Sequence, residues 1–313
     1  MSNTGVLVYR TRRAADRLTW FDRTGARLHT LGETGVHLGI SLSPSEKEVA
    51  FTRRDPHTGR QDIWRADRVS AATTRVTFGP ADQFDPVWSP DGSRLLYAST
   101  NVGYSSLHTD TTCEIREIGL DGHGDRLLLT AENLTAPWST DGRFLLYHEI
   151  HSGRKMDTWA LPLPGGGKPI PLLQGSPNQV FPVFSSDGKW IAYSSDESGK
   201  WEVYVAPFSP ERAPAGKRMV SDGGGSHGEW SRDGKQLYYL AADKRIMAVA
   251  VDTAHERFTA GAPRALFQSD IVNDFRARFA VTSDGQQFLI PSTVGQGGPA
   301  VATVMVNWMP ARE

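Results

Sequence analysis

Residues 86–99 read Pro-Val-Trp-Ser-Pro-Asp-Gly-Ser-Arg-Leu-Leu-Tyr-Ala-Ser, and this stretch decides the fold. The Asp91-Gly92 pair is typical of a tight hairpin turn, because glycine adopts a positive φ without a steric penalty. Short runs of aromatic and aliphatic residues lie on both sides of the pair, and such runs between turn residues indicate β-strands. The stretch therefore predicts two antiparallel strands joined by an Asp-Gly turn.

The same stretch recurs along the chain with small changes. Its turn begins at positions 43, 89, 139, 185, 231 and 282, so the period is 46 to 51 residues. A period in this range is typical of the four-stranded blades of a β-propeller. The turns read Ser43-Pro44-Ser45-Glu46 (a degenerate copy), Ser89-Pro90-Asp91-Gly92, Ser139-Thr140-Asp141-Gly142, Ser185-Ser186-Asp187-Gly188, Ser231-Arg232-Asp233-Gly234 and Thr282-Ser283-Asp284-Gly285.

These repeats predict an all-β chain, because no stretch of twelve residues has a helical period. We expect residues 1–313 to form a single β-propeller of six four-stranded blades. Seven blades remain an alternative, since residues 2–9 resemble a further copy without its innermost strand. We expect the ring to be closed by a composite blade, in which residues 5–32 supply three outer strands and residues 276–308 an inner strand and two more. A start in the middle of a blade also favours a fragment of a longer parent chain.

Composition excludes several classes of protein. The 34 lysines and arginines nearly balance 35 aspartates and glutamates, so the net charge is −1 and a nucleic-acid-binding surface is not expected. The single cysteine, Cys113, excludes an internal disulfide and a multi-cysteine zinc site. The chain contains no run of 18 apolar residues, so the sequence predicts no membrane span. Residues 1–5 lack signal-peptide features, so as written we expect a cytoplasmic monomer, or a location outside the cytoplasm if a longer parent carries an anchor.

The repeat also carries a family resemblance. The pattern of an aromatic residue, Ser-Pro-Asp-Gly and a following Tyr or Phe resembles the TolB-type propeller repeat, a relative of the WD repeat. The stretches Leu18–Gly25 and Val304–Trp308 resemble the bacterial TolB-like propellers that are often fused to serine/threonine kinase domains. The degenerate turn with Ser45-Glu46 departs from the pattern. The resemblance implies the fold and says little about activity, because propellers host many unrelated functions.

Strand order predicts which residues surround the central channel. We call the face where the innermost strands begin the top face, and the face with the Asp-Gly turns the bottom face. The turn aspartates are expected to be structural, because an aspartate in a turn accepts hydrogen bonds from nearby backbone N–H groups. Residues at the top ends of the strands form a funnel in which we expect a ligand to bind. These candidate ligand-binding residues are Asp85, Asn133, Gln179, Asp196 and Arg276.

Histidines and carboxylates at the same funnel raise a second prediction. Imidazole and carboxylate groups that converge can bind a divalent cation such as Ca²⁺ or Zn²⁺, and the cation can polarise a carbonyl or phosphoryl oxygen and activate water. Six-bladed paraoxonases and diisopropylfluorophosphatases place calcium in the channel in this way, and the resemblance to them is one of architecture. The candidate catalytic residues are His37, His148, His151, His227 and Glu229, and the candidate metal ligands are these five together with Asp85.

Two local patterns resemble known catalytic motifs but do not meet the structural requirements of those motifs. His148-Glu149-Ile150-His151 lacks the spacing that places two zinc-binding histidines on one helix face. Gly224–Gly228 has the letters of a serine-hydrolase elbow, which requires a strand before it and a helix after it, whereas here a strand follows.

The sequence thus leaves two hypotheses. The favoured one is a binding propeller that holds a small molecule, a peptide or a protein loop in its top-face funnel. The alternative is a metal-dependent hydrolase of esters, lactones or phosphotriesters. Bound metal and chelator-sensitive turnover would distinguish them.

Overall fold

The protein is described here by a computed structural model. It describes residues 7–10, 15–101, 113–131, 133–134, 138–151, 155–163, 167–211, 214, 216–253, 257–271, 278–294 and 302–305.

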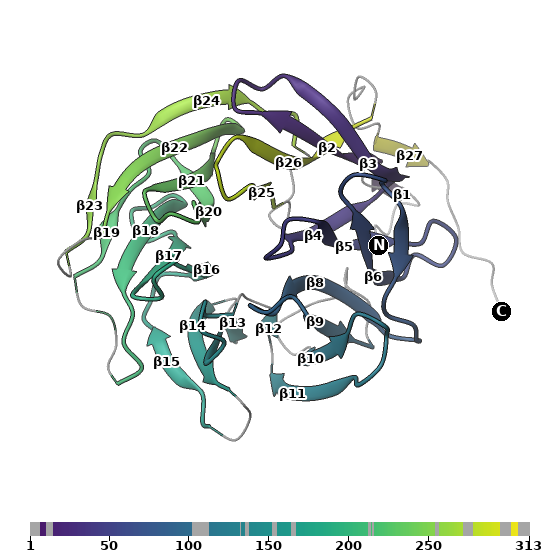
Figure 1. The fold of residues 1–313 in the computed structure, drawn as a ribbon, viewed down its shortest axis with the longest axis horizontal. Coiled ribbons are helices and arrows are strands. Elements are labelled where there is room, and N and C mark those ends of the chain that lie inside the picture. The colour runs from purple at the N-terminus through teal and green to yellow at the C-terminus, as the bar shows by residue number, and fades with distance from the viewer. Residues whose placement is uncertain are drawn as a thin grey trace.

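Six antiparallel sheets stand around a central channel like the blades of a fan (Figure 1). Every blade begins with its innermost strand, and each following strand lies farther from the axis. The described strands therefore confirm the six-bladed propeller, and the seven-bladed alternative is wrong. Among the described residues no helix has the length and apolar character needed to cross a membrane.

The first three blades follow the repeat directly. Blade I contains β4 (His37–Leu42), β5 (Glu48–Arg54), β6 (Gln61–Asp67) and β7 (Thr73–Arg75). Blade II contains β8 (Asp82–Trp88), β9 (Arg94–Thr100), β10 (Cys113–Gly119) and β11 (Arg126–Ala131). Blade III contains β12 (Asn133–Leu134), β13 (Phe144–His151), β14 (Lys155–Pro162) and β15 (Ile170–Leu173).

Blades IV and V repeat the pattern, with one extra strand in blade V. Blade IV contains β16 (Gln179–Phe184), β17 (Trp190–Ser195), β18 (Glu202–Pro207) and β19 (Arg218–Met219). Blade V contains β20 (Gly225–Trp230), β21 (Gln236–Ala241), β22 (Arg245–Asp252) and β23 (Thr259–Ala260). The extra strand β24 (Arg264–Gln268) also pairs with β22, so two short strands share the outer edge of this blade.

Blade VI is composite and closes the ring. Its inner strands β25 (Ala280–Val281) and β26 (Gln287–Thr293) come from the C-terminal part, and its outer strands β2 (Asp16–Asp22) and β3 (Arg27–Gly35) come from the N-terminal part. This arrangement confirms the expected closure. The distribution of strands differs from the expectation, because two outer strands, and not three, come from the N-terminal side.

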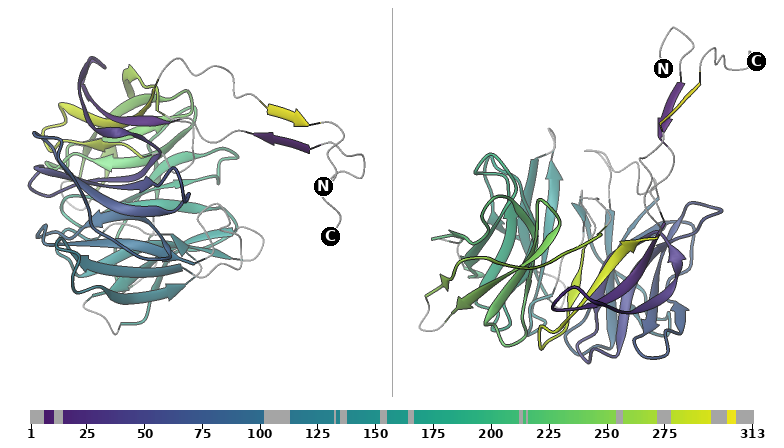
Figure 2. Two further views of the ribbon diagram at one scale, coloured as in Figure 1. Left: turned by 90° about the vertical axis from the view of Figure 1, so that its right-hand side faces the viewer. Right: turned by 90° about the horizontal axis from the view of Figure 1, so that it is seen from above.

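The remaining strand of each end lies outside the ring. β1 (Leu7–Arg10) pairs with β27 (Ala302–Met305) in a separate two-stranded sheet. Figure 2 shows this pair standing away from the blades, and its strands precede the start of β2 and follow the end of β26 on the top face. The four strands of blade VI already complete its sheet, so β1 finds its partner elsewhere.

The Asp-Gly turns are held by hydrogen bonds within each turn. In blade II the hydroxyl of Ser89 donates to Asp91 at 2.6 Å and accepts the backbone N–H of Arg94 at 3.0 Å. Gly92 has a φ of 71°. The Ser89 hydrogen bond and neighbouring N–H groups lower the pKa of Asp91 to about 2. The serine or threonine hydroxyl makes the same 2.6 Å bond in blades III to VI, so the turn aspartates are structural, as expected.

The hydrophobic core lies between neighbouring blades. At the closure, Leu18 and Trp20 of blade VI pack with Val49 and Phe51 of blade I, and all four side chains are fully buried or nearly so. Each apolar blade face buried in this way stabilises the ring by about 25 cal/mol for each Å² removed from water. Radial packing thus brings the inner strands together around one axis.

Candidate functional site in the central channel

The inner strands share one irregularity. Three residues before the end of β8, β16 and β20, the backbone has a positive φ: 53° at Asp85, 54° at Phe181 and 56° at His227. The strand register shifts at each of these points, so every one is a β-bulge. Gly39 holds the same position in β4 with a φ of 51°, and Arg278 holds it ahead of β25. We call these five residues the bulge ring, since the inner strands line the channel (Figure 1).

Two of the bulges are tied to the preceding blade by a hydrogen bond. The backbone N–H of Asp85 donates to the Thr52 hydroxyl at 3.0 Å, and that of His227 donates to the Ser194 hydroxyl at 3.2 Å. A positive φ at a non-glycine residue costs about 1 kcal/mol or more, and these bonds help to offset the cost. The bulges therefore fix the inner strands against one another.

The two halves of the bulge ring differ in chemistry. On the side of blades IV to VI, the Phe181 ring stacks on the His227 ring with a centroid separation of 4.1 Å. The Arg278 guanidinium lies 5.5 Å from the Phe181 centroid, within the range of a cation–π contact. On the other side, Gly39 lies so close to Asp85 that a Cβ at Gly39 would approach the Asp85 Cα to 2.6 Å.

Glu229 extends this cluster toward the bottom face. It lies two residues after His227 in β20, and its side chain keeps partial contact with water. Burial within the channel raises the pKa of Glu229 to about 7, and the positive charge of Arg278 opposes that shift. A carboxyl group of this kind changes charge near neutral pH.

His37 makes a structural contact between two blades. Its Nδ1 is 2.6 Å from Asp16 Oδ1, and its backbone N–H donates to Asp16 Oδ2 at 3.3 Å. Both side chains are almost completely buried. Asp16 belongs to blade VI and His37 to blade I, so this pair joins the two blades at the closure of the ring.

His148 lies across the channel from His37, on the second strand of blade III. It pairs with the inner strand at Leu134, and its ring makes an edge contact with Phe181, with centroids 5.8 Å apart. This is the register position that Thr52 and Ser194 occupy in blades I and IV. His148 therefore packs between blades III and IV.

The other ligand-binding candidates are found in three situations. Gln179 is buried at the start of β16. Asp196 accepts the backbone N–H of Asn178 at 2.8 Å and its side-chain amide at 2.6 Å, so it orders a top-face connection. Asn133 lies in β12 and His151 at the end of β13, but their side chains are outside the described part of the chain, as is the whole of Arg276.

The candidate metal ligands are not gathered in the described part of the channel. Among the described residues, no group of three or more histidine, cysteine, aspartate or glutamate side chains could hold a metal ion. His37 and His148 belong to contacts on opposite sides of the ring, whereas Asp85 and His227 share the bulge ring. The metal site thus stays a prediction.

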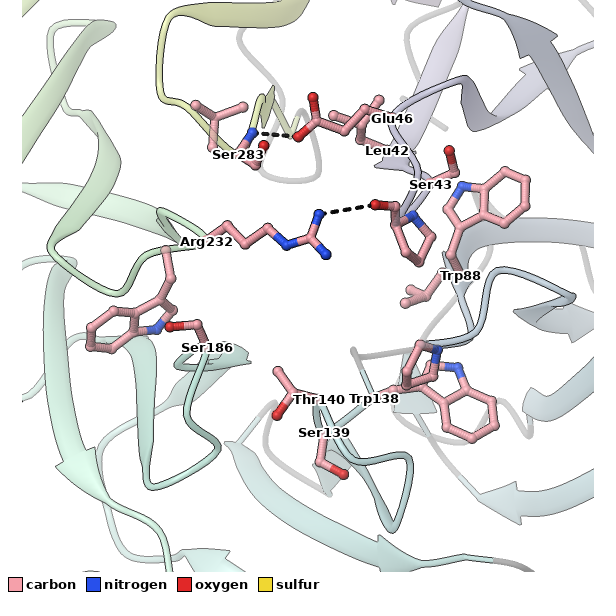
Figure 3. Close-up of a pocket in the computed structure, with 15 residues that line it drawn as sticks. Leu42, Ser43, Glu46, Trp88, Trp138, Ser139, Thr140, Ser186, Arg232 and Ser283 are labelled. Carbon is pink, nitrogen blue, oxygen red and sulfur yellow. Dashed lines mark hydrogen bonds between the residues drawn. The ribbon is translucent and has the colours of Figure 1, made fainter.

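A cavity of about 530 Å³ opens at the bottom end of the channel. Its rim consists of the second residue of each Ser-x-Asp-Gly turn, one from every blade (Figure 3). In blades II to V the turn glycine packs near the rim residue of the preceding blade, as Gly188 does against Thr140. The six rim residues are Pro44, Pro90, Thr140, Ser186, Arg232 and Ser283.

The rim has an apolar and a polar side. Pro44 and Pro90 are adjacent, and Trp88 lies near them. Opposite them, Arg232 is exposed and reaches across the mouth, where it donates to the Pro44 carbonyl oxygen at 3.2 Å (Figure 3). The rim hydroxyls of blades III, IV and VI make no side-chain hydrogen bond within the described residues. Glu46 also lines the cavity, but its carboxylate accepts the Ser283 N–H and pairs with Arg68, so the mouth offers a ligand one cation and three hydroxyl groups.

The sequence reasoning missed these rim residues although the repeat contains them. Three of the four turn residues are nearly constant among the copies. The variable residue, between Ser and Asp, faces the axis in every blade. A variable residue at a fixed place in a repeat is the signal that would have found the rim.

The comparisons with known proteins agree with the fold. No family model matches the sequence. A putative TolB from Agrobacterium tumefaciens has a TM-score of 0.67 at 16% identity, over 90% of this chain and 98% of that chain. A periplasmic gluconolactonase from Pseudomonas aeruginosa has a TM-score of 0.57 at 17% identity, over 90% and 86% of the two chains. An oligogalacturonate lyase in complex with manganese has a TM-score of 0.58 at 13% identity, over 81% and 76%.

At these identities the likeness concerns the fold, because unrelated activities share propeller architectures. The neighbours include a TolB, a lactonase and a lyase, and they do not agree on one chemistry. The protein is a six-bladed β-propeller with the architecture of the TolB proteins.

Proposed function

We propose that this protein is a binding propeller that holds its ligand in the bottom end of the central channel. The observation that carries the proposal is the 530 Å³ cavity, ringed by one variable residue from each blade. Its volume lies within the range of about 300–1,000 Å³ that is usual for small-molecule sites. The top-face funnel, which the sequence favoured, stays a prediction.

The rim is suited to recognition because its backbone is rigid. Five of the six rim residues stand on turns whose hydroxyl, carboxylate and glycine N–H are hydrogen-bonded, as in the turn formed by Ser231 and Asp233. A preorganised rim loses little conformational entropy when a ligand binds. Variation at the rim position then changes the specificity without changing the fold.

The chemistry of the mouth indicates an amphipathic ligand with an anionic group. Arg232 can turn from the Pro44 carbonyl to a carboxylate, because a carboxylate adds charge–charge attraction and can accept two parallel N–H bonds from the guanidinium. The rim hydroxyls can donate to further acceptors, and the proline side can contact an apolar part. A small organic acid or the acidic end of a peptide has this combination.

Thermal unfolding with a defined panel tests the proposal. The probes are N-acetylated amino acids and dipeptides with free carboxylates, each added in large excess. A binder raises the unfolding temperature by mass action. We expect Arg232→Ala to lower the affinity for that ligand about tenfold, which corresponds to the loss of one charge-assisted hydrogen bond.

Arg143→Ala is the matched control, because Arg143 is another exposed arginine of the bottom face. It pairs with Asp141 at 2.6 Å and does not line the cavity. The control should bind like the parent protein. No stabilisation by any member of the panel, or stabilisation that Arg232→Ala leaves intact, would refute a ligand site at this mouth.

The metal-dependent hydrolase is the competing hypothesis, and the same protein can be tested for it. Metal content is measured after purification, and turnover of phenyl acetate, gluconolactone and a phosphotriester is measured with and without chelator. Chelator-sensitive turnover that depends on His148 or His227 would replace the binding proposal. If neither chelator nor substitution changes the turnover, those histidines have no catalytic role.

A further inference from the structure

A second depression lies on the outer part of the bottom face, away from the channel. It has a volume of about 920 Å³ and shares no lining residue with the channel mouth. One wall is formed by the start of β17, the end of β18 and β19, all in blade IV. The other wall is the segment 257–259 at the start of β23 in blade V. We call this depression the rim groove.

Cations line the rim groove, and its described lining residues include no acid. Lys189, Arg218 and Arg257 are all exposed and line it, and no aspartate or glutamate is among its described lining residues. Within the described chain, no carboxylate forms an ion pair with any of the three. Arg218 donates to the Ala260 carbonyl oxygen at 3.5 Å, the outer limit of a hydrogen bond. Three positive charges therefore face one groove.

Two nearby charges do not change this balance. Lys217 also lines the groove, but its ammonium pairs with Glu197. Asp187 lies two residues before Lys189, yet it accepts the Lys189 backbone N–H at 3.0 Å and the Ser185 hydroxyl at 2.6 Å. The carboxylate of Asp187 is thus committed to its own turn.

Aromatic side chains form the apolar surface between these cations. Phe208 and Phe258 are partly exposed on opposite walls, and Trp190 is buried between them. Phe258 packs on Trp190 at a centroid separation of 5.6 Å, and Phe208 packs edge-on against Phe184 at 4.9 Å. Because both phenylalanines are held by other rings, their exposed parts are fixed before anything binds.

From this combination we propose that the rim groove docks an acidic segment of a partner protein that carries an aromatic or aliphatic side chain. The acidic side chains pair with the cations of both walls, and the apolar side chain packs between Phe208 and Phe258. Clusters of basic residues around fixed aromatic anchors are typical of peptide-docking surfaces. The extent of the groove and the spread of its charges favour an extended segment over a single small anion.

A nucleic acid fits the molecule less well than an acidic peptide. Its affinity would depend on neutralising many phosphates, whereas the whole chain has a net charge of −1 and the groove supplies only a few cations. A short acidic segment needs only the charges that the groove supplies.

Selection from a phage-displayed peptide library on the full chain tests the proposal. Synthetic copies of the enriched peptides are then titrated by fluorescence polarisation against the parent protein and a Lys189→Ala/Arg257→Ala double variant. We expect enriched peptides to combine acidic and aromatic or aliphatic residues, and the double variant to bind them about tenfold more weakly. Affinity should also fall as the salt concentration rises, because the charges are exposed.

Lys235→Ala is the matched control. Lys235 holds the position of Lys189 in the next blade, two residues after the turn aspartate, and it does not line the groove. Its substitution should leave peptide affinity unchanged. Thr259→Asp places a negative charge in the groove at an exposed position and should abolish binding while the thermal unfolding temperature is retained.

Three results would overturn the proposal. Enrichment of peptides without acidic residues would remove the charge argument. Equal binding by the double variant would place the peptide elsewhere. Tight binding of poly-aspartate, or displacement of the peptide by ATP alone, would identify an unspecific anion site or a nucleotide site in place of a peptide groove.

Discussion

The charge of Glu229 is expected to make the stability of the propeller depend on pH. Burial in the channel favours the neutral carboxyl group and raises its pKa to about 7, against a usual value near 4.5. The folded chain therefore binds more protons than the unfolded chain between these two values. Since stability falls with pH wherever the folded state binds more protons, the free energy of unfolding should decrease from about pH 4.5 to about pH 7 and above.

The size of the effect follows from the same difference in pKa. At 1.36 kcal/mol for each pKa unit, the difference between the two pKa values changes the free energy of unfolding by about 3 kcal/mol. The Glu229 side chain keeps partial contact with water, which screens the cost of its charge, so we expect about 2 kcal/mol. Glu229→Gln removes the titration with almost no change of volume. It should match the parent protein below about pH 4.5 and exceed its stability by about 2 kcal/mol at about pH 8.

Urea unfolding followed by tryptophan fluorescence measures this difference across the pH range. All other titratable groups are common to both proteins, so subtracting one curve from the other isolates the contribution of Glu229. If the difference between Glu229→Gln and the parent protein does not change with pH, the carboxyl group titrates normally and the account of the channel interior is wrong.

Two further substitutions test the contacts that hold the ring. Asp16→Ala leaves His37 without its buried partner and should cost about 3–5 kcal/mol in the same unfolding assay, whereas a loss below about 1 kcal/mol would contradict a closing role for the pair. Gly39→Ala should cost about 2–4 kcal/mol, because its φ is 51° and its Cβ would overlap the Asp85 backbone. Gly199→Ala is its control, with a φ of 87° but open space around the Cβ; equal losses would show that the contact with Asp85 contributes nothing.

The fold could be predicted from the sequence because each blade repeats the same local signal. The Ser-x-Asp-Gly turn places one strand before it and one after it, and six copies specify six blades. The composite closure also followed from the position of the last copy near the C-terminus. The partner of Leu7–Arg10 did not follow, since a short apolar strand pairs equally well by local criteria with an outer blade edge or with β27.

The candidate site could be predicted only in part. Asp85 and His227 do lie beside the channel, because the start of each inner strand is close to the axis. His37 was assigned to the funnel, and its actual partner Asp16 could not be found from spacing, since the two residues meet only when the ring closes. Residue type alone does not distinguish a metal-binding histidine from a buried histidine that links two blades. The rim residues are the second residues of the six turns. They lie close together only because the whole ring brings the turns around one axis.

The shared blade VI also affects how the chain reaches its folded state. Asp16 pairs with Thr293, so the seven residues of β2 must wait for β26, which follows blades I to V in the sequence. Contacts so distant in sequence raise the contact order and slow folding. A chain that ends before β26 would leave the apolar flanks of blades I and V uncovered, and nascent or truncated forms should consequently aggregate or require a chaperone.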